Sequence, residues 1–293
     1  MRVATILAVS LCFVLGAEPR LPADDARDGD AQFACMQVEK NDVVRLMQRN
    51  VDNATVRAQI RHLEADFRSF LRDHPQHVGA LVSYGGLLYE QQREDEAVKW
   101  WHKAVAAPVS GAGDATARGH AYNNLGQYYG ENGRAADALR YHQRACELSP
   151  DEAMFHYNWA ITCSLFRSEA RQVYGWDTAE VFRRSLGGYR KARDLTPGDF
   201  AFSRGYAEAL YLMPDHDWTE VCDAWKFCLK QSLEKNQRQH VYVQVALACV
   251  HLEHYDEARK WLAKIEDGQY VASRNALTRK LTKLEAAKFA AQR

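Results

Sequence analysis

The segment 121–150 constrains the fold more than any other part of the chain. It reads AYNNLGQYYGENGRAADALRYHQRACELSP. Gly126 and Tyr129 lie in a run whose apolar residues share one face of a helix. Gly133 interrupts that helix, a second apolar face follows, and Pro150 ends it. The segment is therefore predicted to form two short antiparallel helices, with small residues where the backbones come closest.

This pattern resembles the tetratricopeptide repeat, a 34-residue unit written W-x2-L-G-x2-Y, then A-x3-F, then P. Most of the marker positions carry the residue of the family, namely Leu125, Gly126, Tyr129, Ala138 and Pro150. At the other two, Tyr122 stands in place of the Trp and His142 in place of the Phe. Counted from Gly119 as position 1, Gly126 is at position 8 and His142 at position 24.

The same pattern recurs along the chain at intervals of 34 to 47 residues, which indicates one repeating unit with loop insertions. The residues at position 20 are Leu63, Ala97, Ala138, Ser185, Val221 and Ala258. In the fourth unit, an insertion of about thirteen residues is followed by Asp177 and Glu180, a spacing typical of a helix start. Because one hairpin cannot bury its own apolar face, the units are expected to stack.

The predicted fold is all-α: an α-solenoid of about six tetratricopeptide-like helical hairpins with a C-terminal capping helix. The predicted segments are a signal peptide at 1–17, a flexible leader at 18–34, a degenerate N-terminal helical hairpin at 35–77, the repeat array at 78–266 and the capping helix at 267–293. The resemblance implies a right-handed stack with a concave groove lined by the first helix of each hairpin.

The first residues indicate export. Arg2 precedes an uncharged apolar run at 3–15 that ends in small residues, as in a secretory signal peptide. The run is shorter than the ~20 residues that span a membrane. An exported protein, periplasmic or secreted, with no membrane insertion after cleavage is therefore expected.

The composition gives no indication of nucleic-acid binding, because 38 basic residues balance 38 acidic ones. No nucleophile elbow, paired-carboxylate motif or P-loop is present, so neither catalysis nor a cofactor is predicted. His251 with His254, and His216, are interpreted as polar turn residues with no metal, since no third ligand is near in sequence. The predicted partner is a protein or peptide.

Six cysteines follow the predicted signal peptide. Buried free thiols are one interpretation, because free cysteine is among the most buried residue types. Export would also permit disulfides. The best candidate pair is Cys222 with Cys249, on neighbouring antiparallel helices, and the sequence leaves its state open.

The resemblance implies that positions 2, 5, 6, 9, 12 and 13 line the groove. Position 6 carries Asn124 and Asn158, and a carboxamide can donate to a C=O and accept from an N–H at once. The predicted groove residues are His120, Asn123, Asn124, Gln127, Tyr157, Asn158, Arg204, Glu208, Tyr211 and Gln244. The clamp for chaperone-tail carboxylates found in the family is not predicted, because only Asn124 matches it.

The predicted function is a non-catalytic exported scaffold that binds a peptide or protein partner in this groove. One alternative is an array that supports a cryptic enzymatic or metal site, in the fourth unit's insertion or at the histidine turns. Another is a structural protein that self-associates through Leu277, Leu281 and Leu284 of the last helix.

Overall fold

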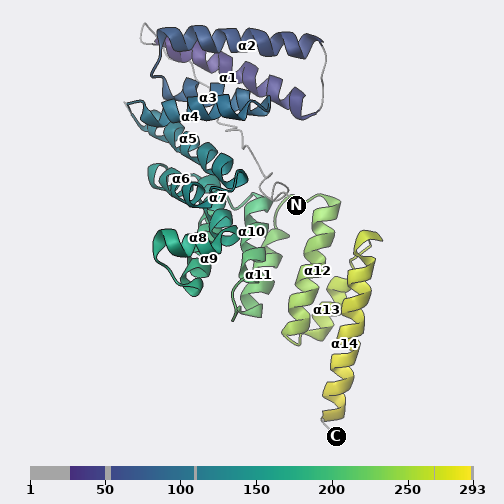
Figure 1. Ribbon diagram of the computed structural model, residues 1–293. Coiled ribbons are helices and arrows are strands. Elements are labelled where there is room, and N and C mark those ends of the chain that lie inside the picture. The colour runs from purple at the N-terminus through teal and green to yellow at the C-terminus, as the bar shows by residue number, and fades with distance from the viewer. Residues whose placement is uncertain (1–26, 50–53, 109–110, 267, 292–293) are drawn as a thin grey trace. The chain divides into compact units, whose positions relative to one another are not determined.

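The computed structural model describes residues 27–49, 54–108, 111–266 and 268–291. Within these ranges all regular secondary structure is helical, and the predicted all-α solenoid class is confirmed (Figure 1). The chain divides into two compact units, unit 1 up to Thr162 and unit 2 from Cys163. The predicted signal peptide lies outside the described residues. No helix among the described residues has the length and apolar character to cross a membrane.

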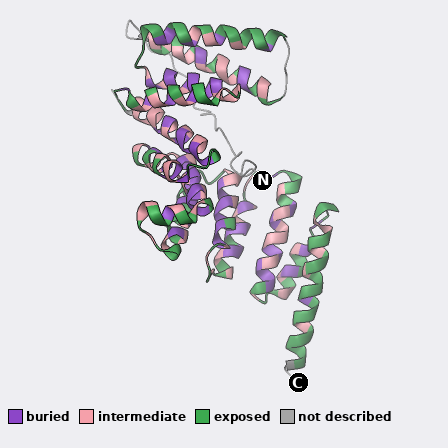
Figure 2. Ribbon diagram, viewed as in Figure 1, coloured by how far each residue is buried: buried purple, intermediate pink, exposed green. Residues whose placement is uncertain are grey.

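Unit 1 is a stack of antiparallel hairpins in which consecutive helices pack in pairs, α1 on α2, α3 on α4 and α5 on α6. Its helices are α1 (Arg27–Gln48), α2 (Ala54–Asp73), α3 (Val78–Glu90), α4 (Glu94–Ala106), α5 (Ala112–Glu131), α6 (Ala135–Leu148) and the greater part of α7 (Ala153–Leu165). Figure 2 shows α2 as mostly exposed along its length, because it carries only a narrow buried stripe that includes Leu63, Phe67 and Phe70.

Helix α1 begins earlier than the sequence analysis predicts. The residues 27–34 were assigned to the flexible leader, but they form the first turns of α1. The reason is aromatic packing: the ring centroid of Phe33 lies 6.2 Å from that of Phe70 and 4.6 Å from that of His77. These contacts give the start of the helix an apolar partner that its Asp-rich local composition does not reveal.

Unit 2 continues the pattern of paired helices and ends in a long terminal helix. It contains α8 (Arg167–Tyr174), α9 (Thr178–Leu195), α10 (Phe200–Leu210), α11 (Trp218–Cys228), α12 (Lys235–His251), α13 (Tyr255–Leu262), the short 3-10 helix η2 (Gly268–Tyr270) and α14 (Val271–Ala291). The insertion of the fourth repeat forms α8. Asp177 caps α9 as predicted, because its side chain accepts from the Glu180 backbone N–H at 2.7 Å.

The last helix covers the end of unit 2. Helix α14 packs against α12 and α13, and Leu281 is buried at 2% exposure. Most of its remaining surface is exposed, as Figure 2 shows, and Leu284 is 37% exposed. Leu281 is therefore covered within the chain, as expected of a capping helix, whereas Leu284 stays exposed.

The two best-matching hairpins close in the same way, by an aromatic ring lying against a glycine. A Cβ atom at Gly85 or at Gly126 would lie well inside the 3.0 Å that real Cβ contacts respect, against the rings of Trp101 and His142 respectively. These are positions 8 and 24 of each repeat. The absence of a side chain on the first helix therefore lets the ring of the second helix rest on its backbone.

The His142 ring is also part of a buried polar chain. Thr162 Oγ1 donates to the Asn158 carbonyl oxygen at 2.8 Å, so it accepts from His142 Nδ1, also at 2.8 Å. His142 is 1% exposed, and burial lowers the pKa of its imidazole to about 4. The ring is therefore neutral at physiological pH and links α6 to α7.

Replacing Gly126 by alanine should disrupt this closure. The added methyl collides with a ring that is fully buried and held by Thr162, so the free energy of unfolding should fall by about 1–3 kcal/mol. Gly187→Ala is the matched control: Gly187 lies inside α9 with nothing within 4 Å of its Cβ position. This control should gain about 0.5–1 kcal/mol. Urea unfolding followed by circular dichroism measures both, and equal effects would contradict the packing argument.

Acid should unfold the protein in part through His142. Its folded-state pKa lies below the 6.5 of an unperturbed imidazole, so the unfolded chain binds the proton first as the pH falls. The resulting stability is present above pH 6.5 and is lost between about pH 6.5 and pH 4, at about 1.4 kcal/mol per pH unit. His142→Phe, the residue of the family at position 24, should flatten this slope in unfolding measured at pH 7, 6 and 5. An unchanged slope would exclude His142 as the titrating group.

Candidate functional site

The first helices of unit 1 form a continuous surface. Helix α3 packs on both α1 and α5, so these three helices lie side by side. Gln37 on α1 donates its amide N–H to Ser83 Oγ on α3 at 2.6 Å. We call this surface the first-helix face, and its polar and titratable members are Gln37, Lys40, Ser83, Tyr89, Glu90, His120, Asn124 and Gln127.

A charged group sits at the centre of this face. Lys40 extends from α1 over Gly86 on α3, and its Nζ lies 3.6 Å from the point where a Cβ of Gly86 would stand. Burial lowers the pKa of Lys40 to about 8, although the charge of Glu90 raises it in part. Burial raises the pKa of Glu90, although the charge of Lys40 lowers it in part. The glycine thus makes room for an ammonium group that has lost much of its water.

His120 on α5 extends the same group. Burial lowers the pKa of its imidazole to about 4, and the nearby charge of Lys40 lowers it further. Its ring meets that of Phe155 edge-on, with centroids 4.9 Å apart. Lys40 on α1 therefore interacts electrostatically with Glu90 on α3 and with His120 on α5. Such perturbed groups cluster at functional sites.

A second polar group borders the first. Tyr89 donates its hydroxyl to Glu131 Oε2 at 2.5 Å, and Gln127 donates its amide N–H to the other oxygen of that carboxylate at 3.1 Å. Burial and the Glu131 carboxylate both raise the pKa of Tyr89. These bonds connect the ends of α3 and α5 on the same face and orient Gln127.

The predicted amide groups divide into internal and accessible ones. Asn158 Nδ2 donates to Asn123 Oδ1 at 2.9 Å, and these two residues are 9% and 6% exposed. Tyr157 is also buried, at 6%. Asn124, at position 6, is only half-buried. The Asn123–Asn158 pair therefore joins α5 to α7, and Asn124 remains the amide that can reach a ligand.

The four predicted groove residues of unit 2 form two pairs, Arg204 with Glu208 and Tyr211 with Gln244. Arg204 Nε lies 3.7 Å from Glu208 Oε1 on α10. Tyr211, at the end of α10, donates its hydroxyl to Gln244 Oε1 on α12 at 3.0 Å and accepts from Trp225 Nε1 at 3.2 Å. Burial raises the pKa of Tyr211 to about 12. The Tyr211–Gln244 bond links two first helices, as the Gln37–Ser83 bond does in unit 1.

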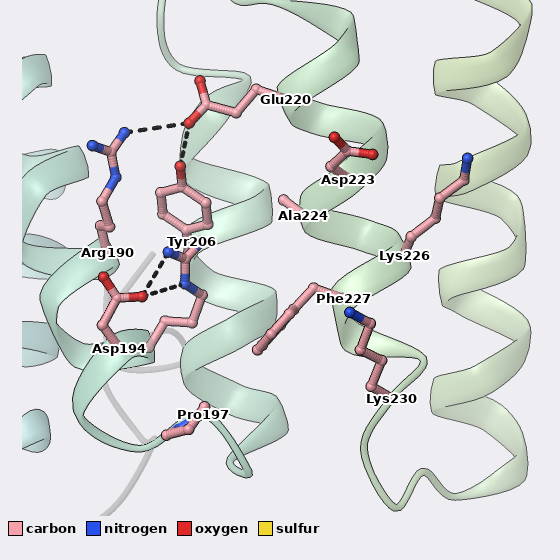
Figure 3. A pocket seen from close by; sticks show the side chains of 11 residues that line it. Arg190, Asp194, Pro197, Tyr206, Glu220, Asp223, Ala224, Lys226, Phe227 and Lys230 are labelled. Atoms are coloured by element: carbon pink, nitrogen blue, oxygen red, sulfur yellow. Dashed lines mark hydrogen bonds and ion pairs between the residues drawn. The ribbon is translucent and has the colours of Figure 1, made fainter.

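Unit 2 also has a hollow of about 960 Å³ beside α9, α10 and α11. Figure 3 shows Arg190 and Tyr206 both pointing at Glu220, and the Arg190 guanidinium lies 3.3 Å from that carboxylate. Arg193 pairs with Asp194 at 2.6 Å. Both arginines of the hollow are therefore already paired with acids of the protein itself.

A group that could hold a metal lies on α1 and α2. The ligand atoms of Glu39, His62 and Asp66 all lie within 4.8 Å of one another. However, His62 Nδ1 is 2.9 Å from Asp66 Oδ2 one turn along α2, and this contact accounts for the proximity of those two residues without a metal. Of the predicted turn residues, His251 stacks on Trp218 with centroids 3.7 Å apart.

Gln37 and Lys40 fall in the predicted degenerate hairpin at 35–77 but were not among the predicted groove residues. A usable signal was present. Met36 and Val43 are buried members of an apolar stripe, and Lys40 falls between them at helical spacing. A lysine inside an apolar stripe must be covered by another element, here α3.

The neighbouring residues Asn123 and Asn124 should respond differently to replacement by alanine. Asn123→Ala removes the acceptor of the Asn158 amide N–H inside the protein, so we expect a loss of about 1–3 kcal/mol in unfolding free energy. Asn124→Ala should stay within about 0.5 kcal/mol. Thermal and urea unfolding of the two variants measure this. A larger cost at Asn124 would contradict the assignment of Asn123 to the interior.

The sequence of residues 78–151 matches the family model of the tetratricopeptide repeat. No curated protein matches the chain. Among solved structures, it is similar to YrrB, described as a tetratricopeptide protein with an unusual peptide-binding site, at 12% identity and a TM-score of 0.54 over 73% of this chain and 97% of that one. It is also similar to PilF of Pseudomonas aeruginosa, at 12% identity and a TM-score of 0.54 over 84% of this chain and 99% of that one. These likenesses establish the helical-repeat fold.

Proposed function

Because the chain is a tetratricopeptide repeat protein, we propose that the first-helix face of unit 1 binds an extended segment of a partner protein. The observation that carries this proposal is the position of Lys40, which extends from α1 over Gly86 of α3 and interacts with Glu90 on α3 and with His120 on α5. Titratable groups with shifted pKa values of this kind cluster at functional sites. The peptide-binding site attributed to YrrB, a protein of the same fold, also supports a peptide ligand.

The rest of the face suits an extended backbone. Asn124 presents a half-buried carboxamide, which can donate to a peptide C=O and accept from a peptide N–H. Gln127 lies one helical turn further along α5 and is oriented by Glu131. An extended segment that crosses α1, α3 and α5 would meet the charged group first and these amides next. Its own side chains would then decide specificity.

We further propose that the protein acts after export, as a non-catalytic scaffold in the periplasm or outside the cell. The support is the signal-like sequence at 1–17, whose apolar run follows Arg2 and ends in small residues. The balanced charge gives the chain no attraction to nucleic acid, so its partner is a protein of the same compartment.

Lysine replacements on opposite sides of a hairpin test the face. Immobilised full-length protein would capture a partner from the native compartment, and calorimetry would then give the dissociation constant. Lys40→Met keeps the length of the side chain and removes its charge, and it should weaken binding about tenfold or more, or ~1.4 kcal/mol. Lys99→Met is the control, because Lys99 is exposed on the second helix α4.

The proposal is supported if Lys40→Met loses affinity for the partner and Lys99→Met keeps the wild-type affinity. Both variants should keep the circular dichroism spectrum and melting temperature of the wild type. Unchanged affinity at Lys40, or an equal loss at the two positions, would reject the first-helix face as the binding surface. The affinity of an Asn124→Ala variant measures the contribution of the amide separately from that of the Lys40 charge.

A further inference from the structure

Two buried thiols face each other in unit 2. Cys222 on α11 and Cys249 on α12 have their Sγ atoms 3.9 Å apart. The residues are 3% and 0% exposed, and both are free thiols. Their helices pack directly against each other. The other cysteine of α11, Cys228, bonds to the Ala224 carbonyl oxygen at 3.4 Å and has no thiol as partner. The structure therefore brings the sulfur atoms of Cys222 and Cys249 together across two neighbouring helices.

The surroundings favour ionisation of one member. The hydrogen bond between the thiols lowers the pKa of Cys222, with a smaller contribution from Lys226, while burial opposes the shift. Sharing the same hydrogen bond raises the pKa of Cys249. The Lys226 ammonium lies one turn along α11 from Cys222 and is paired with Glu257 at 2.8 Å. Because Cys222 is also the less deeply buried of the two and shares its helix with Lys226, we assign it as the attacking sulfur.

We propose that Cys222 and Cys249 are a redox-active pair that forms a reversible disulfide between α11 and α12. The oxidant is a low-molecular-weight disulfide such as oxidised glutathione. This inference is independent of the partner-binding proposal, since it concerns unit 2 alone.

The reaction proceeds by two exchanges. The Cys222 thiolate attacks one sulfur of the oxidant, its S–S bond breaks, and one small thiolate leaves. The Cys249 thiolate then attacks the Cys222 sulfur of the mixed disulfide and expels the second small thiolate. The two protein thiols lose two electrons in all, the oxidant is reduced to two thiols, and these take up the two protons.

The bond would join consecutive hairpins. Helix α11 is the second helix of the hairpin α10–α11, and α12 is the first helix of α12–α13. Cys222 and Cys249 are 27 positions apart, so the bond closes a loop that includes the whole connection between the two helices. Closing such a loop restricts the unfolded chain and stabilises the folded one. In an oxidising compartment the joined form would be the resting state.

The test is a redox titration of the full chain. Reduced protein is equilibrated in buffers of increasing oxidised-to-reduced glutathione ratio, quenched in acid, alkylated and analysed by peptide mass spectrometry. The expected product is one intramolecular link between the peptides that carry Cys222 and Cys249, with a melting temperature several degrees above the reduced form. A different linkage, or free thiols at Cys222 and Cys249 in the most oxidising buffer, would overturn the proposal.

Three alanine variants complete the test. Cys249→Ala should trap glutathione as a stable mixed disulfide on Cys222, whereas Cys222→Ala should leave Cys249 largely unmodified, because it is fully buried and lacks its attacking neighbour. Cys228→Ala is the matched control and should form the link as the wild type does. Glutathione on Cys249 in preference to Cys222 would reverse the order of attack and contradict the assigned roles.

Discussion

The structure depends on a contact between an aromatic ring and the backbone of a helical glycine. At Gly85 and at Gly126 the first helix presents no side chain, and the rings of Trp101 and His142 rest on its backbone. The resulting close approach sets the spacing of the hairpins α3–α4 and α5–α6. Tight packing of this kind restricts how the next hairpin can pack. The contact within one hairpin therefore influences the position of its neighbour in the stack. In His142 the ring also carries the hydrogen bond to Thr162, which ties α6 to α7.

The first-helix face is a consequence of that spacing. Because α3 touches both α1 and α5, side chains from three hairpins reach one another across it. Gly86, next to the packing glycine Gly85, leaves space for Lys40 on the outer side of the same helix. Two adjacent glycines of α3 therefore serve two different surfaces. One admits the Trp101 ring to the interior, and the other admits an ammonium group to the face.

The predictable part of the fold is the part that depends on residues near in sequence. Small and aromatic residues at fixed spacing predict the hairpins, and Asp177 predicts the start of α9, because both are local requirements. The start of α1 escaped prediction because it depends on Phe33 meeting Phe70 and His77 from distant positions. The neighbourhood of Cys222 and Cys249 was predicted from the antiparallel order of their helices, and the structure confirms it at 3.9 Å.

Less of the candidate site could be predicted from the sequence. Repeat position alone marked Asn123 and Asn158 as groove residues, but position does not tell whether an amide faces a ligand or another amide, and these two bond to each other. Lys40 belongs to a helix whose repeat register is too degenerate to assign. Its place on the face follows only from how α1 packs on α3, which is a tertiary contact.

Amide hydrogen exchange of the protein with and without its captured partner tests the central claim most directly, because it reports which helices the partner covers. Binding at the first-helix face predicts slower exchange in α1, α3 and α5 in the complex, with α2, α4 and α6 unchanged. Protection that appears on the second helices, with the first helices exchanging as in the free protein, would contradict it.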